Sequence, residues 1–217
     1  MPCRPVNLPL RLTFAALAVV CALAPAAQGA EPAAAATRVR VDTTLGSFVI
    51  ELDTARAPLT TANFLSYVRT GFYAGTIFHR VISNFVAQGG GYDEKGALRS
   101  TQPPVPNESG NGLANKRGTV GLARSEAPHS GNSQFYVNLN DNDALDPTPL
   151  RWGYAVFGRV VDGIDVAERI GHTPTGPASG FPHDAPVEPV VIRRIELISS
   201  PDALPAPAAA VTPAPKG

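Results

Sequence analysis

Cysteine is nearly absent from this chain: among 217 residues there are two, Cys3 and Cys21. Both lie in residues 1–30, which have the features of a segment removed on export. A chain that has lost this segment contains no thiol and forms no disulfide, so a hydrophobic core must stabilise it. About 165 residues remain between this segment and the C-terminal tail, enough for one domain with a sizeable core.

Motifs for metal-dependent and nucleophilic catalysis are missing as well. The four histidines show no ligand spacing, and neither HExxH nor CxxC occurs. Ser133 lies in GNSQF, which is not the G-x-S-x-G of a serine hydrolase. The glycines at 89–91 follow an expected strand but open no helix that would bind a phosphate. We therefore predict neither a metal nor another cofactor.

An excess of positive charge is also lacking, since 18 basic residues are balanced by 18 acidic ones. Loss of Arg4 and Arg11 with residues 1–30 leaves 16 basic residues against the same 18 acidic ones. The formal charge is then about −2, counting each charged side chain as one unit. This balance does not favour a nucleic-acid-binding surface.

Residues 1–30 have the pattern of a secretory signal peptide. Two arginines precede the apolar run LTFAALAVVCALA, and small residues follow it. The run is about thirteen residues long, short of the roughly twenty that a membrane helix needs. We therefore expect cleavage after Ala26 or Ala30, a periplasmic mature protein, and no stable membrane insertion of the mature chain.

The C-terminal residues 200–217 are rich in proline and alanine and poor in bulky side chains, which is typical of a disordered tail. Residues 31–199 are left as a single domain. Most of it favours strands, because eight runs combine β-branched or aromatic residues with turn residues between them. They are RVRVDTTLG, SFVIELD, TIFHRVI, NFVAQGG, GTVGLAR, SQFYVNL, YAVFGRVV and VVIRRIELI. Eight strands in one domain favour a closed β architecture.

Two helices interrupt these strands. The first is expected over residues 57–71, where Pro58 suits a helix start and Gly71 a C-terminal cap. The second is expected over residues 162–171, where apolar residues three apart share one face. Two long loops, 92–116 and 171–189, are expected to be functional or to cover other parts of the domain.

The stretch FHRVISNFVAQGG, residues 78–90, places a cation and an amide among many apolar residues. Simple strand alternation puts Arg80 on the same face as Phe78 and Ile82. Because a charge among apolar neighbours needs partners, this stretch taken alone favours a structural Arg80 bonded to loop carbonyls. A functional arginine remains the alternative.

The order of the motifs adds information that no single stretch carries. FHRVISNFVAQGG, then GTVGLAR, GNSQFYVNL, LD and YAVFGRVVDG, resembles the cyclophilin-type peptidyl-prolyl isomerases over residues 38–198. The stretch PPVPNESGNGLANKRGT and the signal pattern are more similar to the bacterial exported branch. The resemblance implies a mainly β fold, a closed eight-stranded antiparallel barrel with two capping α-helices. It also implies catalysis of rotation about Xaa-Pro bonds.

The resemblance assigns the main catalytic role to Arg80, as a donor to the nitrogen of the twisted imide. It further implies nine peptide-binding residues: Phe85, Val86, Gln88, Ala123, Arg124, Gln134, Tyr136, Leu145 and Tyr154. Gln134 would either bind the substrate backbone or brace a loop, and we favour the second role. Phe135 alternates with Tyr136 and is expected to point into the barrel.

Four positions depart from the best-known members of this family. Val86 replaces a methionine, Tyr136 a phenylalanine, Ala144 a tryptophan and Tyr154 a histidine. The tyrosine at 154 is usual in the bacterial branch. The resemblance implies weak cyclosporin binding, because the indole missing at Ala144 lines the drug's site in sensitive relatives. Trp152 is close in sequence and would replace it only if the loop placed it there.

The expected partners are proline-containing segments of unfolded or partly folded exported proteins, bound by a monomer. A competing hypothesis is a binding module that captures such segments without turning them over. The joint presence of Arg80, Phe85 and Gln88 favours the enzyme.

Overall fold

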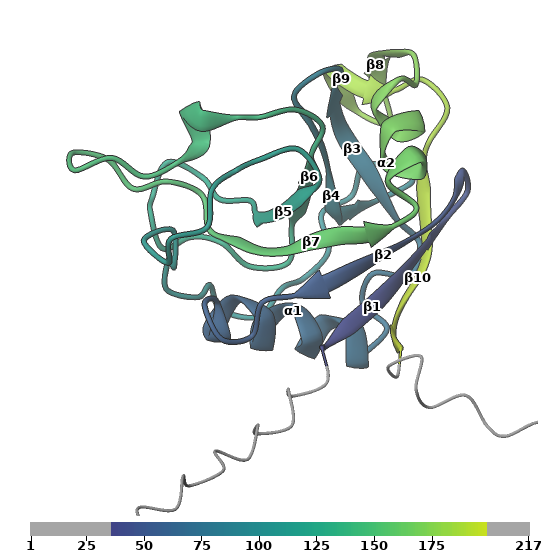
Figure 1. Ribbon diagram of the computed structural model, residues 1–217. Helices are drawn as coiled ribbons and strands as arrows, with labels where there is room; N and C mark the ends of the chain where they lie inside the picture. Colours follow the sequence, from purple (N-terminus) through teal and green to yellow (C-terminus); the bar gives the residue numbers. More distant parts are fainter. Residues whose placement is uncertain (1–35, 199–217) are drawn as a thin grey trace, which may run out of the picture. The chain divides into compact units, whose positions relative to one another are not determined.

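Eight strands close into a barrel, as the eight strand-like runs predict (Figure 1). Their order around the barrel is β1 (Arg38–Thr43), β10 (Val191–Ile198), β3 (Thr76–Ile82), β4 (Val86–Asp93), β6 (Phe135–Asn138), β5 (Thr119–Leu122), β7 (Val156–Asp162) and β2 (Gly46–Leu52). All neighbouring pairs are antiparallel. Closure leaves the sheet without a free edge.

This computed structural model describes residues 36–198. They belong to the compact unit Ala35–Gly217. The expected signal segment, residues 1–30, and the expected tail, residues 200–217, lie outside the described residues. No helix between residues 36 and 198 has both the length and the apolar character needed to cross a bilayer.

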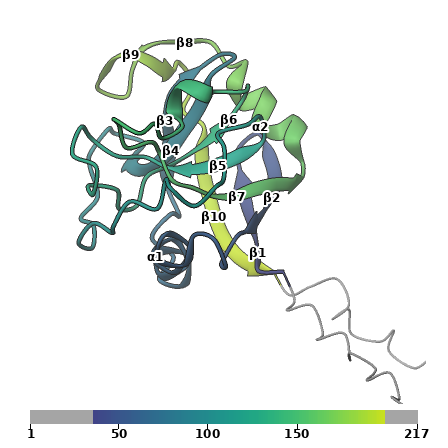
Figure 2. The same cartoon turned by 60° about the vertical axis from the view of Figure 1, so that its left-hand side comes forward.

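The two helices, α1 (Pro58–Arg69) and α2 (Ile164–Gly171), lie at opposite ends of the barrel (Figures 1 and 2). Pro58 is the first residue of α1, where its missing N–H costs no hydrogen bond. Gly71 follows the C-cap with φ 67°, a left-handed conformation that glycine adopts without strain. Both helices are confirmed within two residues of the ends expected from the sequence.

An aromatic cluster joins α1 to the barrel interior. The ring of Phe64 lies 5.3 Å from Tyr73, 5.6 Å from Phe135 and 5.2 Å from Phe157, between ring centroids. Phe135 is completely buried, as its alternation with Tyr136 predicts. Packed rings of this kind contribute about 0.5–1.5 kcal/mol per pair beyond their buried area. The side chains on the inner face of β6 therefore pack in the core, and those on its outer face are available for contacts outside the barrel.

The register of β3 against β4 corrects one expectation. Phe78 pairs with Gly89 but Arg80 pairs with Gln88, so the register shifts between them. Such a bulge resets the alternation of side chains along a strand. Phe78 is fully buried in the barrel core, whereas Arg80 is half-buried on the outer wall. The prediction that Arg80 shares a face with Phe78 is therefore wrong, and Arg80 shares the outer face with Ile82.

The region 171–189, expected as a loop, contains a two-stranded hairpin formed by β8 (Thr175–Ala178) and β9 (Phe181–Pro186). It lies beside β3 (Figures 1 and 2). The ring of Phe181 is 5.4 Å from His79 and 5.0 Å from Tyr92. The hairpin thus covers His79, which is 6% exposed.

We expect acid to destabilise the fold through His79. Burial lowers the pKa of His79 from 6.5 to about 4, and the nearby charge of Arg80 acts in the same direction. Its Nδ1 has no hydrogen-bond partner among the described residues. The unfolded chain takes up the proton more readily, so the stability that depends on neutral His79 is complete above pH 6.5 and is lost as the pH falls toward 4.

Urea unfolding at several pH values tests this expectation, and the loss should be about 3 kcal/mol across the window. His79→Phe fills the same space without a titrating group and should remove most of the dependence. His183→Phe, at a side chain that is 75% exposed, is the matched control and should keep it. Equal pH dependence in the two variants would show that another group is responsible.

Candidate functional site

A cavity of about 330 Å³ opens on the outer wall of the barrel, beside β4. Nine of the ten predicted site residues line it: Arg80, Phe85, Val86, Gln88, Ala123, Arg124, Tyr136, Leu145 and Tyr154. They come from β3, β4, β6 and three connecting segments. Alternation explains the contribution of β4, because Val86 and Gln88 point outward while Ala87 between them is buried in the core.

The apolar part of the cavity is a small hydrophobic cluster separate from the barrel core. Its three buried members are Val86, Ala123 and Tyr136. Phe85, Leu145 and Tyr154 pack against them and remain partly exposed. A partly open apolar wall of this kind suits a small apolar group that enters from solvent.

The polar part of the cavity is a row of three side chains. Nη1 of Arg80 donates to Oε1 of Gln88 at 3.4 Å, and Nε2 of Gln88 donates to Oε1 of Gln134 at 3.0 Å. Gln134 does not line the cavity, so in this structure it braces Gln88. Among residues 36–198 no ion pair includes Arg80. Its guanidinium lies 5.9 Å from the centre of the Phe85 ring and is able to donate to a ligand.

A second arginine at the cavity, Arg124, has a different environment. Its Nε donates to the carbonyl of Gly153 at 3.1 Å and its Nη2 to that of Trp152 at 2.8 Å. The guanidinium also stacks 4.4 Å from the centre of the Tyr154 ring. The structural role considered for Arg80, bonding to loop carbonyls, is therefore the one that Arg124 has.

The floor of the cavity depends on Asn115, which the sequence did not single out. The hydroxyl of Tyr136 donates to Oδ1 of Asn115 at 2.7 Å, and burial raises the pKa of Tyr136 well above its ordinary value, which keeps this donor protonated. Nδ2 of Asn115 donates to Oδ1 of Asp146 at 2.8 Å and to the carbonyl of Tyr154 at 3.4 Å. The signals for this residue were its place in the long loop 92–116 and in the stretch PPVPNESGNGLANKRGT, and neither singled out Asn115.

Ala144 is exposed in the short 3₁₀ helix η1 (Asp143–Leu145). Trp152, the single tryptophan of the chain, does not line the cavity. The centroid of the Trp152 ring lies 5.1 Å from that of the His129 ring. Trp152 therefore provides no indole at this cavity, and weak cyclosporin binding stays a prediction. In the described part of the chain, no three His, Cys, Asp or Glu side chains gather where they would hold a metal ion.

The site thus combines a small apolar cavity on the outer wall of a closed barrel with a guanidinium and an amide beside it. Residues 38–197 match the family model described as cyclophilin type peptidyl-prolyl cis-trans isomerase/CLD. The chain belongs to this family, and isomerisation of peptidyl-prolyl bonds is the activity that its relatives carry by name.

Two bacterial relatives show the extent of the similarity. A peptidyl-prolyl cis-trans isomerase of Streptomyces antibioticus is 48% identical over 163 residues, which cover 74% of this chain and 98% of the relative. Peptidyl-prolyl cis-trans isomerase B of Escherichia coli is 46% identical over 162 residues, which cover 73% and 98%. A crystal structure of a Cryptosporidium parvum cyclophilin, determined in the presence of the dipeptide Ala-Pro, has a TM-score of 0.62 and 26% identity, covering 75% of this chain and 99% of that one.

Proposed function

We propose that this protein accelerates rotation about Xaa-Pro bonds in exported proteins, and that Arg80 stabilises the twisted imide nitrogen. One observation carries the proposal: a guanidinium without an ionic partner among the described residues stands at the rim of a small apolar cavity. The proline ring would occupy the apolar part, between Phe85, Tyr136 and Leu145. The relative studied with Ala-Pro supports a ligand of this chemistry.

The chemistry requires only a donor in the right place. Resonance gives the X-Pro bond a rotation barrier of about 18–20 kcal/mol. Twisting the bond ends the resonance and leaves a lone pair on the prolyl nitrogen. A donor aimed at this nitrogen interacts with the twisted state more strongly than with either planar state, and this difference lowers the barrier. Arg80 suits the task because a guanidinium is always charged and presents its N–H groups in a rigid fork.

Catalysis also requires that the peptide on one side of the rotating bond is bound in a fixed position, and Gln88 would bind it. Its amide lies between Arg80 and Gln134 and is therefore fixed in orientation before a substrate arrives. A pre-positioned amide can bond the peptide backbone next to the proline and reduces the entropy lost on binding. No nucleophile, metal or proton transfer takes part in this mechanism.

A protease-coupled assay on a short Xaa-Pro peptide tests the activity directly. We expect the protein to speed cis-to-trans conversion in proportion to its concentration. Saturable binding of the same peptide without any acceleration would contradict the proposal and favour a module that only captures proline-containing segments.

Export is inferred from residues 1–30, and it makes a separate prediction. The mature chain should begin near Ala27 or Glu31, should act in the periplasm as a monomer, and should be indifferent to reductant because it has lost Cys3 and Cys21. N-terminal sequencing of protein recovered from the periplasm checks the cleavage site. An unprocessed product confined to the cytosol would contradict the export proposal.

A further inference from the structure

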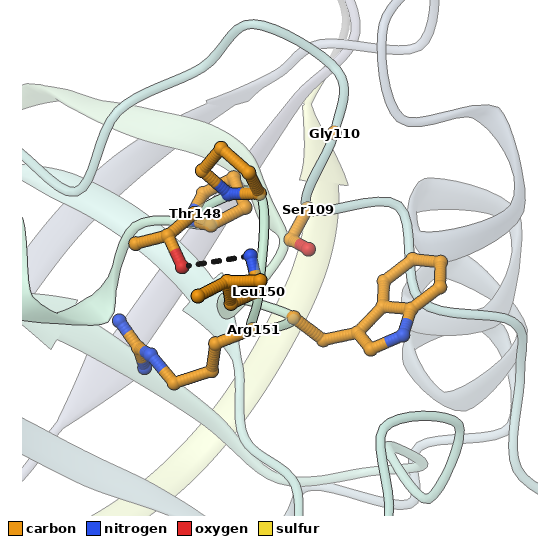
Figure 3. A pocket seen from close by; sticks show the side chains of 8 residues that line it. Ser109, Gly110, Thr148, Leu150 and Arg151 are labelled. Atoms are coloured by element: carbon orange, nitrogen blue, oxygen red, sulfur yellow. Dashed lines mark hydrogen bonds between the residues drawn. The ribbon is translucent and has the colours of Figure 1, made fainter.

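A second hollow, of about 390 Å³, has no role in the mechanism above (Figure 3). It is separate from the cavity beside Arg80, Phe85 and Tyr136, which is the proline cavity of the proposed mechanism. The hollow is lined by Ser109, Gly110, Pro147, Thr148, Pro149, Leu150, Arg151 and Trp152. Two of these are large apolar side chains that face solvent, Leu150 at 98% and Trp152 at 47% exposure. Large apolar groups gathered on a surface commonly mark a binding site.

The turn that displays Leu150 is held in place. Thr148 and Arg151 exchange two backbone hydrogen bonds, at 2.9 and 3.2 Å, and the Leu150 N–H points to Oγ1 of Thr148 at 3.4 Å (Figure 3). Nη2 of Arg151 donates to the carbonyls of Ala144 at 2.7 Å and Asp146 at 2.9 Å. A surface that is already ordered loses little conformational entropy when a ligand binds.

The hollow and the proline cavity are separate, but two short connections of the chain join their linings. Leu145 lines the cavity and Pro147 the hollow, while Tyr154 lines the cavity and Trp152 the hollow. Each connection spans two residues, which reach at most ~7 Å even when extended. Arg124 also links the two, since it lines the cavity and bonds the carbonyl of Trp152. An extended peptide advances ~3.3 Å per residue, so residues two to four positions from a bound proline lie ~7–13 Å from it, far enough to span these short connections.

We infer that the hollow is a subsite for an apolar side chain of the same client polypeptide, two to four residues away from the proline. This inference rests on the proposed isomerase function and adds to it a preference for apolar residues at a distance from the bond. Unfolded exported proteins expose such residues, which folded proteins bury. The subsite would therefore direct the enzyme toward unfolded clients, and short peptides would not detect it.

The single tryptophan makes the subsite observable, because Trp152 lines the hollow and does not line the proline cavity. We would titrate the wild-type protein with three peptides: a short Xaa-Pro peptide, a longer one with apolar residues on both flanks, and a longer one with serine at those positions. The apolar-flanked peptide should shift the emission and the other two should not. Binding of the apolar-flanked peptide without an emission change would overturn the inference.

Leu150→Ser keeps the reporter and removes the most exposed apolar group. It should weaken binding of the apolar-flanked peptide by about 5- to 20-fold and leave turnover of the short peptide within about two-fold. Val187→Ser, at another exposed apolar side chain with 57% exposure, is the matched control and should alter neither. Equal effects of Leu150→Ser on both peptides would contradict a separate subsite.

Two further measurements distinguish the client subsite from a failure of the isomerase proposal and from self-association of the protein. If the wild type turns over neither peptide, the isomerase proposal fails, while the emission titration still decides whether the hollow binds the flanks. Sedimentation of the wild type and of Leu150→Ser shows whether a second copy of the chain occupies the hollow. Self-association that Leu150→Ser abolishes, together with no response to the apolar-flanked peptide, would overturn the client subsite.

Discussion

Replacing Arg80 by alanine should lower kcat/KM for a short Xaa-Pro peptide by about 10- to 1000-fold, equivalent to roughly 1.4–4 kcal/mol of transition-state stabilisation. The loss follows from the proposed mechanism, in which Arg80 is the donor to the twisted imide nitrogen. Stability should change little, because Arg80 lies on the outer wall and the one hydrogen bond that its side chain makes within residues 36–198, to Gln88, is long at 3.4 Å. The protease-coupled assay and urea unfolding of the same samples measure both quantities.

Two companion variants make the Arg80 result specific. Arg80→Lys keeps the charge but replaces the rigid fork by a point charge on a flexible stem, so it should also lose most of the activity. Arg40→Ala removes an exposed arginine of β1 and should leave turnover unchanged. A folded Arg80→Ala protein with near-native turnover would remove Arg80 from the reaction and require another donor.

Much of the barrel could be predicted because its strands lie in runs rich in β-branched and aromatic residues, separated by turn residues. The β8–β9 hairpin was missed for a local reason, since it contains Pro177, Pro182 and Pro186, and proline argues against a strand within a sheet. It is a two-stranded sheet of its own, where such residues are tolerated. The bulge beside Arg80 was missed because sequence alternation does not show where the register shifts.

The residues of the candidate site could be predicted from the sequence, but their individual contacts could not. Arg80 and Arg124 illustrate the difference. Arg80 could be selected because it lies in the motif FHRVISNFVAQGG. Whether an arginine instead bonds loop carbonyls depends on the position of a loop that is distant in sequence. The carbonyls of Trp152 and Gly153 reach Arg124 only after the chain between them has folded. Contacts of this long-range kind are set by tertiary structure, and local sequence gives little sign of them.

Asn115 is the clearest example of a residue whose role depends on long-range contacts, because its side chain connects three parts of the cavity wall. Its Oδ1 accepts from the Tyr136 hydroxyl and from Nδ2 of Asn138, while its Nδ2 donates to Asp146 and more weakly to the carbonyl of Tyr154. The side chain is fully buried. Buried polar groups that lose their partner cost about 1–3 kcal/mol each, so the groups around Asn115 depend on one another.

We therefore expect Asn115→Ala to lower the free energy of unfolding by about 3–4 kcal/mol, because it leaves several buried groups without their partner. The same change should reduce kcat/KM by about 10-fold in protein that is still folded, since the ring of Tyr136 and the Leu145 segment lose their common support. Urea unfolding and peptide turnover at a temperature well below the unfolding midpoint measure the two effects separately.

Tyr136→Phe is the matched variant, because it removes one hydrogen bond and keeps the ring that forms the wall. Asn115 then still accepts from Asn138 at 3.1 Å, so the loss of stability should be about 1 kcal/mol, with turnover within about two-fold of the wild type. The double variant should be little worse than Asn115→Ala alone, since both changes act on the same hydrogen bond. If the two single changes instead add fully, or if Asn115→Ala is as active as Tyr136→Phe, the wall does not depend on Asn115 and the packing of the apolar cluster is enough to hold it.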